Sequence, residues 1–142
     1  MEYKEGQLLR FTPFKFKNGA TPKKKYFIVL KCMNDCLMMA SLPTSKNHIP
    51  TSIPLSSGCI NIPERAVNAF IFLPHNKVTD SFNFPLPTFV YGEQIDEYYK
   101  VYLDDMETEI EDFGIIHDDI FRMLKECLKQ SVLLKRKYRN LL

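Results

Sequence analysis

The sequence predicts a mainly β fold that ends in a single α-helix. Short hydrophobic runs recur along residues 7–103, prolines and an Asn-Gly pair separate them, and only the C-terminal segment has helical periodicity. The chain has 142 residues, of which 45% are hydrophobic and 25% charged, as is typical of a globular domain. We therefore expect one domain over residues 1–142, built on a small barrel or compact sheet.

The N-terminal part of the chain predicts three strands. Residues 7–11 form the first, and Pro13 limits its continuation because proline cannot donate to a sheet ladder. Residues 26–30 are continuously apolar, β-branched and aromatic, which predicts a central strand buried on both faces. Residues 36–42 suit the next strand, and Asn34-Asp35 predicts a hairpin turn between the two.

The middle of the chain is less regular. Residues 43–64 contain four prolines and one apolar stretch at 60–62. Further strands are expected at 69–73 and 88–91, and residues 98–103 are strand-like too. With the first three strands they complete a barrel over about residues 5–103.

The C-terminal part combines an acidic segment with a helix. Eight acids and no Lys or Arg lie between Asp104 and Asp119, and we expect residues 104–117 to be a solvated acidic connection. Apolar residues then recur at i, i+3, i+4 and i+7, which predicts one helix over about residues 118–139. Its apolar stripe packs on the sheet or, alternatively, forms a subunit interface.

The net charge of +2 conceals an uneven distribution along the chain. Residues 1–50 hold nine basic and three acidic side chains, and the lysines of residues 15–31 lie among aromatic residues. Basic groups interleaved with aromatic rings neutralise phosphates and stack on bases. The alternative interpretation is a solvated Lys-rich loop between two strands.

The cysteines and histidines predict no metal site and no cofactor. Cys32, Cys36, Cys59 and Cys127 lack the paired close spacing of structural zinc sites, so we expect buried free thiols in a reducing compartment. A cytoplasmic location is also expected, because the first residues lack the apolar core of a signal peptide and no apolar run suits a membrane span. The catalytic motifs of common hydrolases, nucleotide-binding proteins and zinc peptidases are missing from the sequence.

One cluster of hydroxyl and basic groups remains as a candidate site. If residues 26–30 and 37–42 pair as a hairpin, Lys23-Lys24-Lys25 and Pro43-Thr44-Ser45-Lys46 lie at the same end of it. Hydroxyls donate to phosphate oxygens, and a cation stabilises the charge of a pentacovalent transition state. His48 is near enough in sequence to assist at a phosphate or, alternatively, is an exposed loop residue, and Thr44 and Ser45 alternatively make only a turn.

The order of motifs resembles the MazF/PemK/Kid family of toxin endoribonucleases. The matching segments are Gly6-Gln7-Leu8-Leu9, the loop 16–24, Lys25-Tyr26-Phe27-Ile28-Val29-Leu30, residues 37–42 with Pro43-Thr44-Ser45, residues 89–95, and Gly114-Ile115-Ile116 before the helix. Residues 47–88 look longer than the insertion usual in the family. The resemblance implies a small SH3-like barrel with a C-terminal helix.

The resemblance also implies a function. Members form homodimers, bind single-stranded RNA and cleave it without metal by attack of the ribose 2′-OH on the adjacent phosphate, and an acidic antitoxin neutralises them. By position, Lys25 occupies the place of the catalytic Arg and Thr44 that of the phosphate-binding hydroxyl, with Ser45 beside it. The remaining candidates, all assigned to RNA binding, are Lys15, Lys17, Lys23, Lys24, Lys46 and His48.

Two departures from the family pattern leave a second function open. Lysine is a flexible point charge, whereas arginine is planar and binds a phosphate through two donors at once. Tyr26 stands where the family has proline. The alternative is therefore a non-catalytic module of the same fold that binds nucleic acid or a protein partner through residues 15–31.

Overall fold

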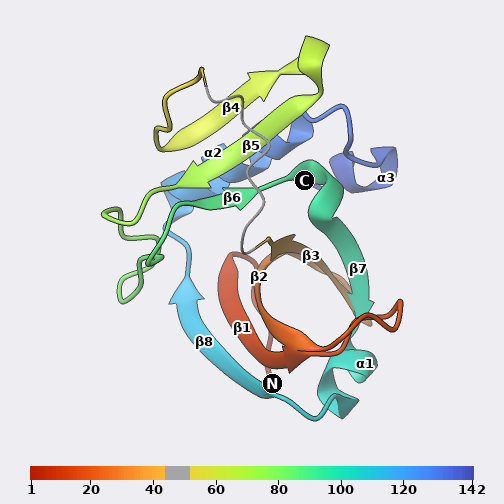
Figure 1. Ribbon diagram of the computed structural model, residues 1–142. Helices are drawn as coiled ribbons and strands as arrows, with labels where there is room; N and C mark the ends of the chain where they lie inside the picture. The colour runs from red at the N-terminus through yellow and green to blue at the C-terminus, as the bar shows by residue number, and fades with distance from the viewer. Residues whose placement is uncertain (44–51) are drawn as a thin grey trace.

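The computed structural model describes residues 1–43 and 52–142 of the chain. It is mainly β, with two antiparallel sheets and a few short helices, which confirms the predicted class (Figure 1). The elements follow in the order β1 (Gln7–Phe14), β2 (Lys23–Cys32), β3 (Cys36–Leu42), β4 (Gly58–Ile62), η1 (Pro63–Arg65), β5 (Val67–Phe72), β6 (Thr88–Val90), η2 (Gly92–Gln94), β7 (Ile95–Tyr99), α1 (Lys100–Asp105), β8 (Glu109–Ile115), α2 (Asp118–Lys129) and α3 (Arg136–Arg139).

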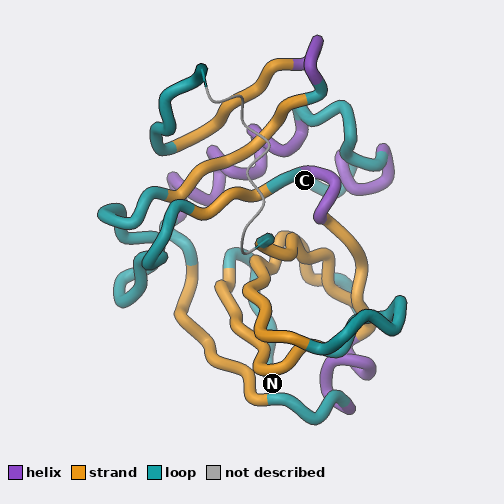
Figure 2. Tube along the Cα trace, in the orientation of Figure 1, coloured by secondary structure: helices purple, strands orange, loops and turns teal. Residues whose placement is uncertain are grey.

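The two sheets lie in different halves of the molecule. One has the strand order β7-β3-β2-β1-β8 and curves strongly in the lower half of Figure 1, and the other has the order β4-β5-β6 in the upper half, with α2 behind it. Figure 2 shows the same division, with loops joining the two halves. Within the described residues β7 and β8 do not pair, so the curved sheet is not a closed barrel. The expected barrel over about residues 5–103 therefore divides, because β4, β5 and β6 form a sheet of their own.

The hairpin of β2 and β3 confirms the prediction for this part of the chain. The two strands pair antiparallel from Tyr26 opposite Leu42 to Cys32 opposite Leu37. Successive side chains of a strand point to opposite faces, and both faces of β2 are buried, as expected. Phe27 and Val29 belong to one apolar cluster, named here the inner cluster. Ile28 and Leu30 belong to a second, named the outer cluster.

The inner cluster lies on the concave side of the curved sheet. Its aromatic rings meet mostly edge to face, with the centroids of Phe11 and Phe27 5.4 Å apart and those of Phe27 and Tyr98 5.6 Å apart. Leu103 of α1 and Met106, just after it, add further apolar surface. The sequence indicated a strand over residues 98–103, but β7 ends at Tyr99 and α1 follows.

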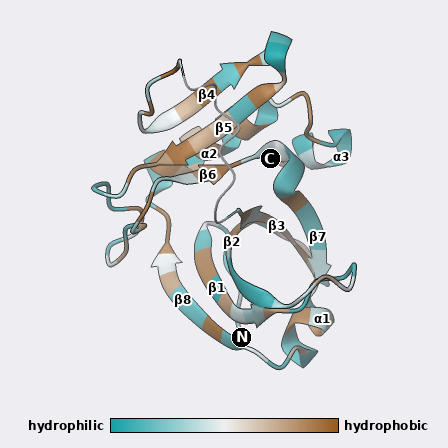
Figure 3. Ribbon diagram, in the orientation of Figure 1, coloured by the Kyte–Doolittle hydropathy of each residue, from teal (hydrophilic) through white to brown (hydrophobic). Residues whose placement is uncertain are grey.

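The outer cluster joins the two sheets. It combines the outward residues of β1, β2 and β3 with residues of β5, β6, α2 and α3. Figure 3 shows the hydrophobic colouring of β5 and β6 beside α2, and the hydrophilic colouring of α3. The apolar stripe of α2 packs here through Leu124 and Leu128, so this part of the helix contributes to the core, as expected.

Strand β1 extends further than its proline suggested. The strand runs to Phe14, and its pairing with β2 shifts between Phe11 and Phe14, so Pro13 falls in the irregular part of the ladder. A proline is tolerated there because its missing N–H leaves no regular ladder bond unmade.

The acidic connection expected over residues 104–117 contains a strand instead. Strand β8 pairs with β1 and covers its second edge, with Glu111 opposite Arg10. These two side chains form an ion pair, and the Arg10 guanidinium lies 5.6 Å from the Tyr26 ring centroid and 5.4 Å from that of Phe113. The alternation of acids with apolar residues in β8 therefore reflects an edge strand, whose charges discourage pairing with other chains.

The helix expected over residues 118–139 is interrupted. α2 ends at Lys129, residues 130–135 form a turn, and the short α3 follows. Ser131 and Leu134, which continue the helical periodicity, are buried all the same. The pattern therefore predicted burial correctly and continuity wrongly.

Two of the four cysteines form a disulfide, which corrects the expectation of four free thiols. Cys59 of β4 and Cys127 of α2 are bonded across 68 residues of sequence, whereas Cys32 and Cys36 are free, as expected. Periodicity within single elements does not reveal that β4 crosses α2 at these two positions. Disulfides are typical of oxidising compartments, so this bond weighs against the expected reducing environment.

No helix in residues 1–43 or 52–142 combines the length and the apolar character that crossing a membrane requires.

Removing the disulfide should destabilise the protein. The bond restricts the unfolded chain over a long loop, so Cys127→Ser, or reduction by dithiothreitol, is expected to lower the free energy of unfolding by about 2–4 kcal/mol. Urea denaturation followed by circular dichroism measures the change. Cys32→Ser is the matched control and should leave the dithiothreitol effect intact; equal stability with and without reductant would contradict the bond.

Candidate functional site

A pocket of about 560 Å³ lies at the end of the curved sheet where β2 begins and β3 ends. Four segments that are distant in sequence contribute to it: the loop before β2, the facing ends of β2 and β3, the start of β7, and the turn before α3. The lining residues are Phe16, Asn18, Ala20, Thr21, Lys23, Lys25, Ser41, Glu93, Gln94, Ile95, Asp96, Tyr98 and Lys135.

Lys25 enters the pocket from β2. It lies two residues before Phe27, so its side chain is on the same face as the inner cluster, and it is only 7% exposed. Ser41 pairs with Phe27 across the hairpin and faces the same side. The apolar lining of the curved sheet therefore changes to polar groups at this end.

Four of the predicted site residues cannot be placed. Thr44, Ser45, Lys46 and His48 lie outside the described residues. Since Tyr26 pairs with Leu42, Lys25 and Pro43 occupy the same end of the hairpin. The segment that carries these four residues therefore follows directly after the end of β3 that lies beside Lys25.

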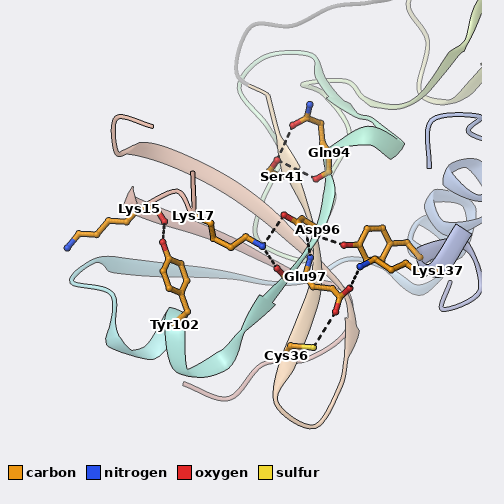
Figure 4. Close-up of polar contacts among 10 residues, drawn as sticks. Lys15, Lys17, Cys36, Ser41, Gln94, Asp96, Glu97, Tyr102 and Lys137 are labelled. Atoms are coloured by element: carbon orange, nitrogen blue, oxygen red, sulfur yellow. Dashed lines mark hydrogen bonds and ion pairs between the residues drawn. The ribbon is translucent and has the colours of Figure 1, made fainter. Parts of the chain in front are cut away.

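The other predicted lysines divide into two groups. Lys23 and Lys17 lie at the pocket: Lys23 lines it, and the Lys17 ammonium group pairs with Asp96 at 3.0 Å and lies 4.5 Å from the Tyr98 ring centroid. Lys24 is exposed and does not line the pocket. Lys15 is bonded through its backbone carbonyl to the Tyr102 hydroxyl, and its side chain points away from Asp96 (Figure 4).

Asp96 connects the separate segments around the pocket (Figure 4). Its carboxylate accepts hydrogen bonds from the Glu97 backbone N–H at 2.8 Å and the Tyr138 hydroxyl at 3.1 Å, besides its contact with Lys17. Burial alone raises the pKa of this carboxyl group, but the bonds to Lys17, Glu97 and Tyr138 outweigh that effect and lower the pKa. Asp96 is therefore ionised at neutral pH, its carboxylate is already hydrogen-bonded to three groups, and it is a weak base.

Several lining residues were missed by the sequence reasoning. Ser41 of β3 donates from its hydroxyl to Oε1 of Gln94 in η2 at 3.3 Å, and both residues line the pocket. The segment Gly92-Glu93-Gln94 contributed to the family resemblance, which was the available signal for Gln94 and Glu93. Lys135 was not a candidate, because the break before α3 has no sequence signal as strong as Gly or Pro.

The turn before α3 packs closely on η2. A Cβ atom added to Gly92 would lie 2.7 Å from both Cβ and Oγ of Ser131, so only glycine permits this approach. Ser131 is buried, and its hydroxyl accepts a hydrogen bond from the Leu133 backbone N–H at 3.2 Å. This contact brings the turn to the pocket and places Lys135 in its lining.

The free cysteines offer no activated nucleophile. Burial, with the negative charges of Asp35 and Glu97, raises the pKa of the Cys36 thiol. Burial and Glu5 raise that of Cys32. Thiols with raised pKa values stay protonated and react slowly. The described residues contain no group of three or more His, Cys, Asp or Glu side chains arranged to hold a metal ion.

The pocket combines the groups that an aromatic phosphate ligand needs. Lys23, Lys25 and Lys135 contribute positive charge to the lining and Glu93 and Asp96 contribute negative charge, and Asp96 is paired with Lys17, which lies beside the pocket. The half-buried ring of Phe16 lies in the same lining, whereas the Tyr98 ring is mostly buried and lies beside Lys17. Cations bind phosphates and rings stack on bases, so the geometry suits a segment of single-stranded nucleic acid.

Comparison with known proteins adds no relative, since no family model, no curated protein and no solved structure matches the chain.

The acid sensitivity of the fold should depend on Asp96. Because its pKa is lowered by folding, its contribution to stability is present above the unfolded pKa of about 3.9 and disappears as the pH falls through the folded value. Asp96→Asn is expected to lower stability at pH 7 and to make the loss of stability below about pH 4 less steep than in the unmodified protein. Urea midpoints between pH 2 and pH 7 measure this, with the exposed Asp105→Asn as control; parallel pH curves for the unmodified protein and Asp96→Asn would contradict it.

Gly92→Ala should disturb the packing of the turn before α3. The new methyl group overlaps Ser131, and we expect a loss of about 1–3 kcal/mol in the free energy of unfolding. In a Ser131→Gly background the same change should cost less, because the overlapping atoms are gone. A double-mutant cycle by urea denaturation measures the coupling, and additive losses would rule out the clash.

Proposed function

We propose that the protein is a metal-independent endoribonuclease of the MazF/PemK kind that cleaves single-stranded RNA, as the toxin of a toxin–antitoxin pair. The observation that carries the proposal is the position of Lys25, a buried cation at the polar end of a curved β-sheet. The proposal also takes this sheet as a divergent, open relative of the SH3-like barrel, which its strong curvature and mainly β composition support.

In the proposed reaction the chain stabilises charge and positions the RNA. The ribose 2′ oxygen forms a bond to phosphorus while the bond from phosphorus to the 5′ oxygen breaks, which leaves a 2′,3′-cyclic phosphate. Lys25 stabilises the charge that develops on the non-bridging oxygens, and Thr44 donates to one of them with Ser45 beside it. The 2′ proton passes to a base, for which His48 is the candidate by its place in the sequence, and solvent returns a proton to the departing 5′ oxygen.

The low exposure of Lys25 favours this role. A cation at the boundary of an apolar core acts through a lower dielectric than one in open solvent, so its effect on a nearby phosphate is larger. Lys23 beside it adds charge, while the half-buried Phe16 provides a surface for a base.

The proposed partners follow from the same reaction. Single-stranded RNA occupies the pocket, an acidic antitoxin segment competes for the same lysines, and two copies of the chain form a homodimer in the cytoplasm. The dimer and the location rest on the family resemblance. In the cytoplasm the disulfide of Cys59 and Cys127 is exposed to reductants. The dithiothreitol experiment above measures how much stability its reduction removes.

The test is RNA cleavage in the presence of EDTA. We expect the unmodified protein to produce ends with 2′,3′-cyclic phosphate, and Lys25→Met to lower the rate about 10²–10³-fold, as loss of one stabilising donor does in other enzymes. Thr44→Ala should lower it comparably. Lys24→Met is the matched control, because Lys24 is exposed and does not line the pocket, and it should retain activity.

Intact RNA at high concentrations of the unmodified protein would defeat the enzymatic proposal. Equal loss of activity in Lys24→Met and Lys25→Met would defeat the assignment of Lys25. Circular dichroism of each variant separates loss of the fold from loss of the site.

A second candidate, a non-catalytic module that binds nucleic acid, is favoured by the chemistry of the pocket. Among the hydroxyls of the described lining, that of Ser41 already donates to Gln94, and Lys25 is a single-point donor where arginine binds in two places. Binding of RNA without cleavage, with an affinity that falls as salt rises, would select this function.

A further inference from the structure

The C-terminal residues 130–142, named here the C-terminal arm, fold back from α2 onto the start of β7. The arm is held by its own hydrogen bonds: the Arg139 guanidinium donates to the backbone carbonyls of Lys129, Ser131 and Leu134 at 3.0, 2.7 and 3.3 Å. One side chain thereby bonds three carbonyls in and just after the last turn of α2. The arm is therefore a defined structure.

Two further contacts attach the arm to β7. The Tyr138 hydroxyl donates to Asp96, and the Lys137 ammonium group pairs with Glu97 at 2.9 Å (Figure 4). Tyr138 is buried in the outer cluster. These contacts join the arm to the same strand that forms one wall of the pocket.

The consequence is the position of Lys135. It is exposed and lines the pocket together with Lys23 and Lys25, although more than a hundred residues separate it from them. Its ammonium group lies 6.0 Å from the Tyr138 ring centroid, and within residues 1–43 and 52–142 it forms no ion pair. Lys137 and Lys17, in contrast, are each paired with a carboxylate of β7.

We propose that Lys135 binds a phosphate of the RNA strand that occupies the pocket, so that Lys135 from the C-terminal arm and Lys23 and Lys25 from β2 contact one strand from two walls. This inference rests on the proposed function and extends it to the substrate-binding surface. RNA is favoured over an acidic peptide because the half-buried Phe16 lines the same pocket and offers a stacking surface that carboxylates do not use.

The experiment measures how affinity depends on salt. The probe is a single-stranded RNA whose riboses carry 2′-O-methyl groups, which leaves no nucleophile and prevents cleavage. Each phosphate contact on a single strand contributes about 0.7 to the slope of log K against log salt. We expect Lys135→Ala to reduce the slope by about 0.7 and to weaken binding about threefold to fivefold at 0.15 M salt, and Lys135→Arg to preserve both.

The matched control is Lys77→Ala. Lys77 is an exposed lysine that lines a different pocket, beside β5 and α2, so its removal changes the net charge equally without touching the proposed strand path. It should leave the slope unchanged. A purely structural role of Lys135 would lower stability without changing the slope, and urea denaturation of each variant records that separately.

The outcomes distinguish this inference from the proposed function. If the unmodified protein binds the probe and Lys135→Ala has the same slope, the inference fails while the proposed function stands. If the probe is bound with the expected dependence on Lys135 but unmethylated RNA stays intact, the inference stands and the enzymatic function fails. If the probe is not bound, or an oligoglutamate of equal charge binds as tightly and with the same dependence on Lys135, the assignment to RNA is overturned.

Discussion

Burial of both faces of β2 is the constraint on which the rest of the structure depends. Phe27 and Val29 fill the concave side of the curved sheet, while Ile28 and Leu30 face the second sheet and α2. A register slip of one residue would exchange these two sets and place Lys25 in the wrong layer. The hairpin with β3 therefore has one acceptable register, and this register fixes which side chains the elements on either side pack against.

The candidate site is a consequence of where that strand begins. On the inner face of β2, Val29 and Phe27 are apolar. Lys25, two residues before Phe27, is the next side chain on that face towards the start of the strand. It is thus held at the boundary between the core and the pocket, where a charge acts strongly on a bound phosphate. Ser41 reaches the same boundary because it pairs with Phe27.

The second wall of the pocket depends on the interrupted helix. α2 is fixed to the outer cluster and, through the disulfide, to β4. The close contact of Ser131 with Gly92 and the bonds of Arg139 turn the chain, and Tyr138 then reaches Asp96. Asp96 contacts both Lys17 in the loop before β2 and Tyr138 in the C-terminal arm, so one carboxylate connects these two segments.

The sequence by itself determined the mainly β class, the β2–β3 hairpin and the position of Lys25 at its end, because alternation, turn residues and antiparallel pairing are local properties. Tertiary structure decided what the local pattern left open. The acids of β8 became an edge strand because β1 offered an unpaired edge, and Cys59 met Cys127 because the second sheet packs on α2. Lys135 joined the pocket because a glycine far away in sequence admitted Ser131, a contact that no helical periodicity encodes.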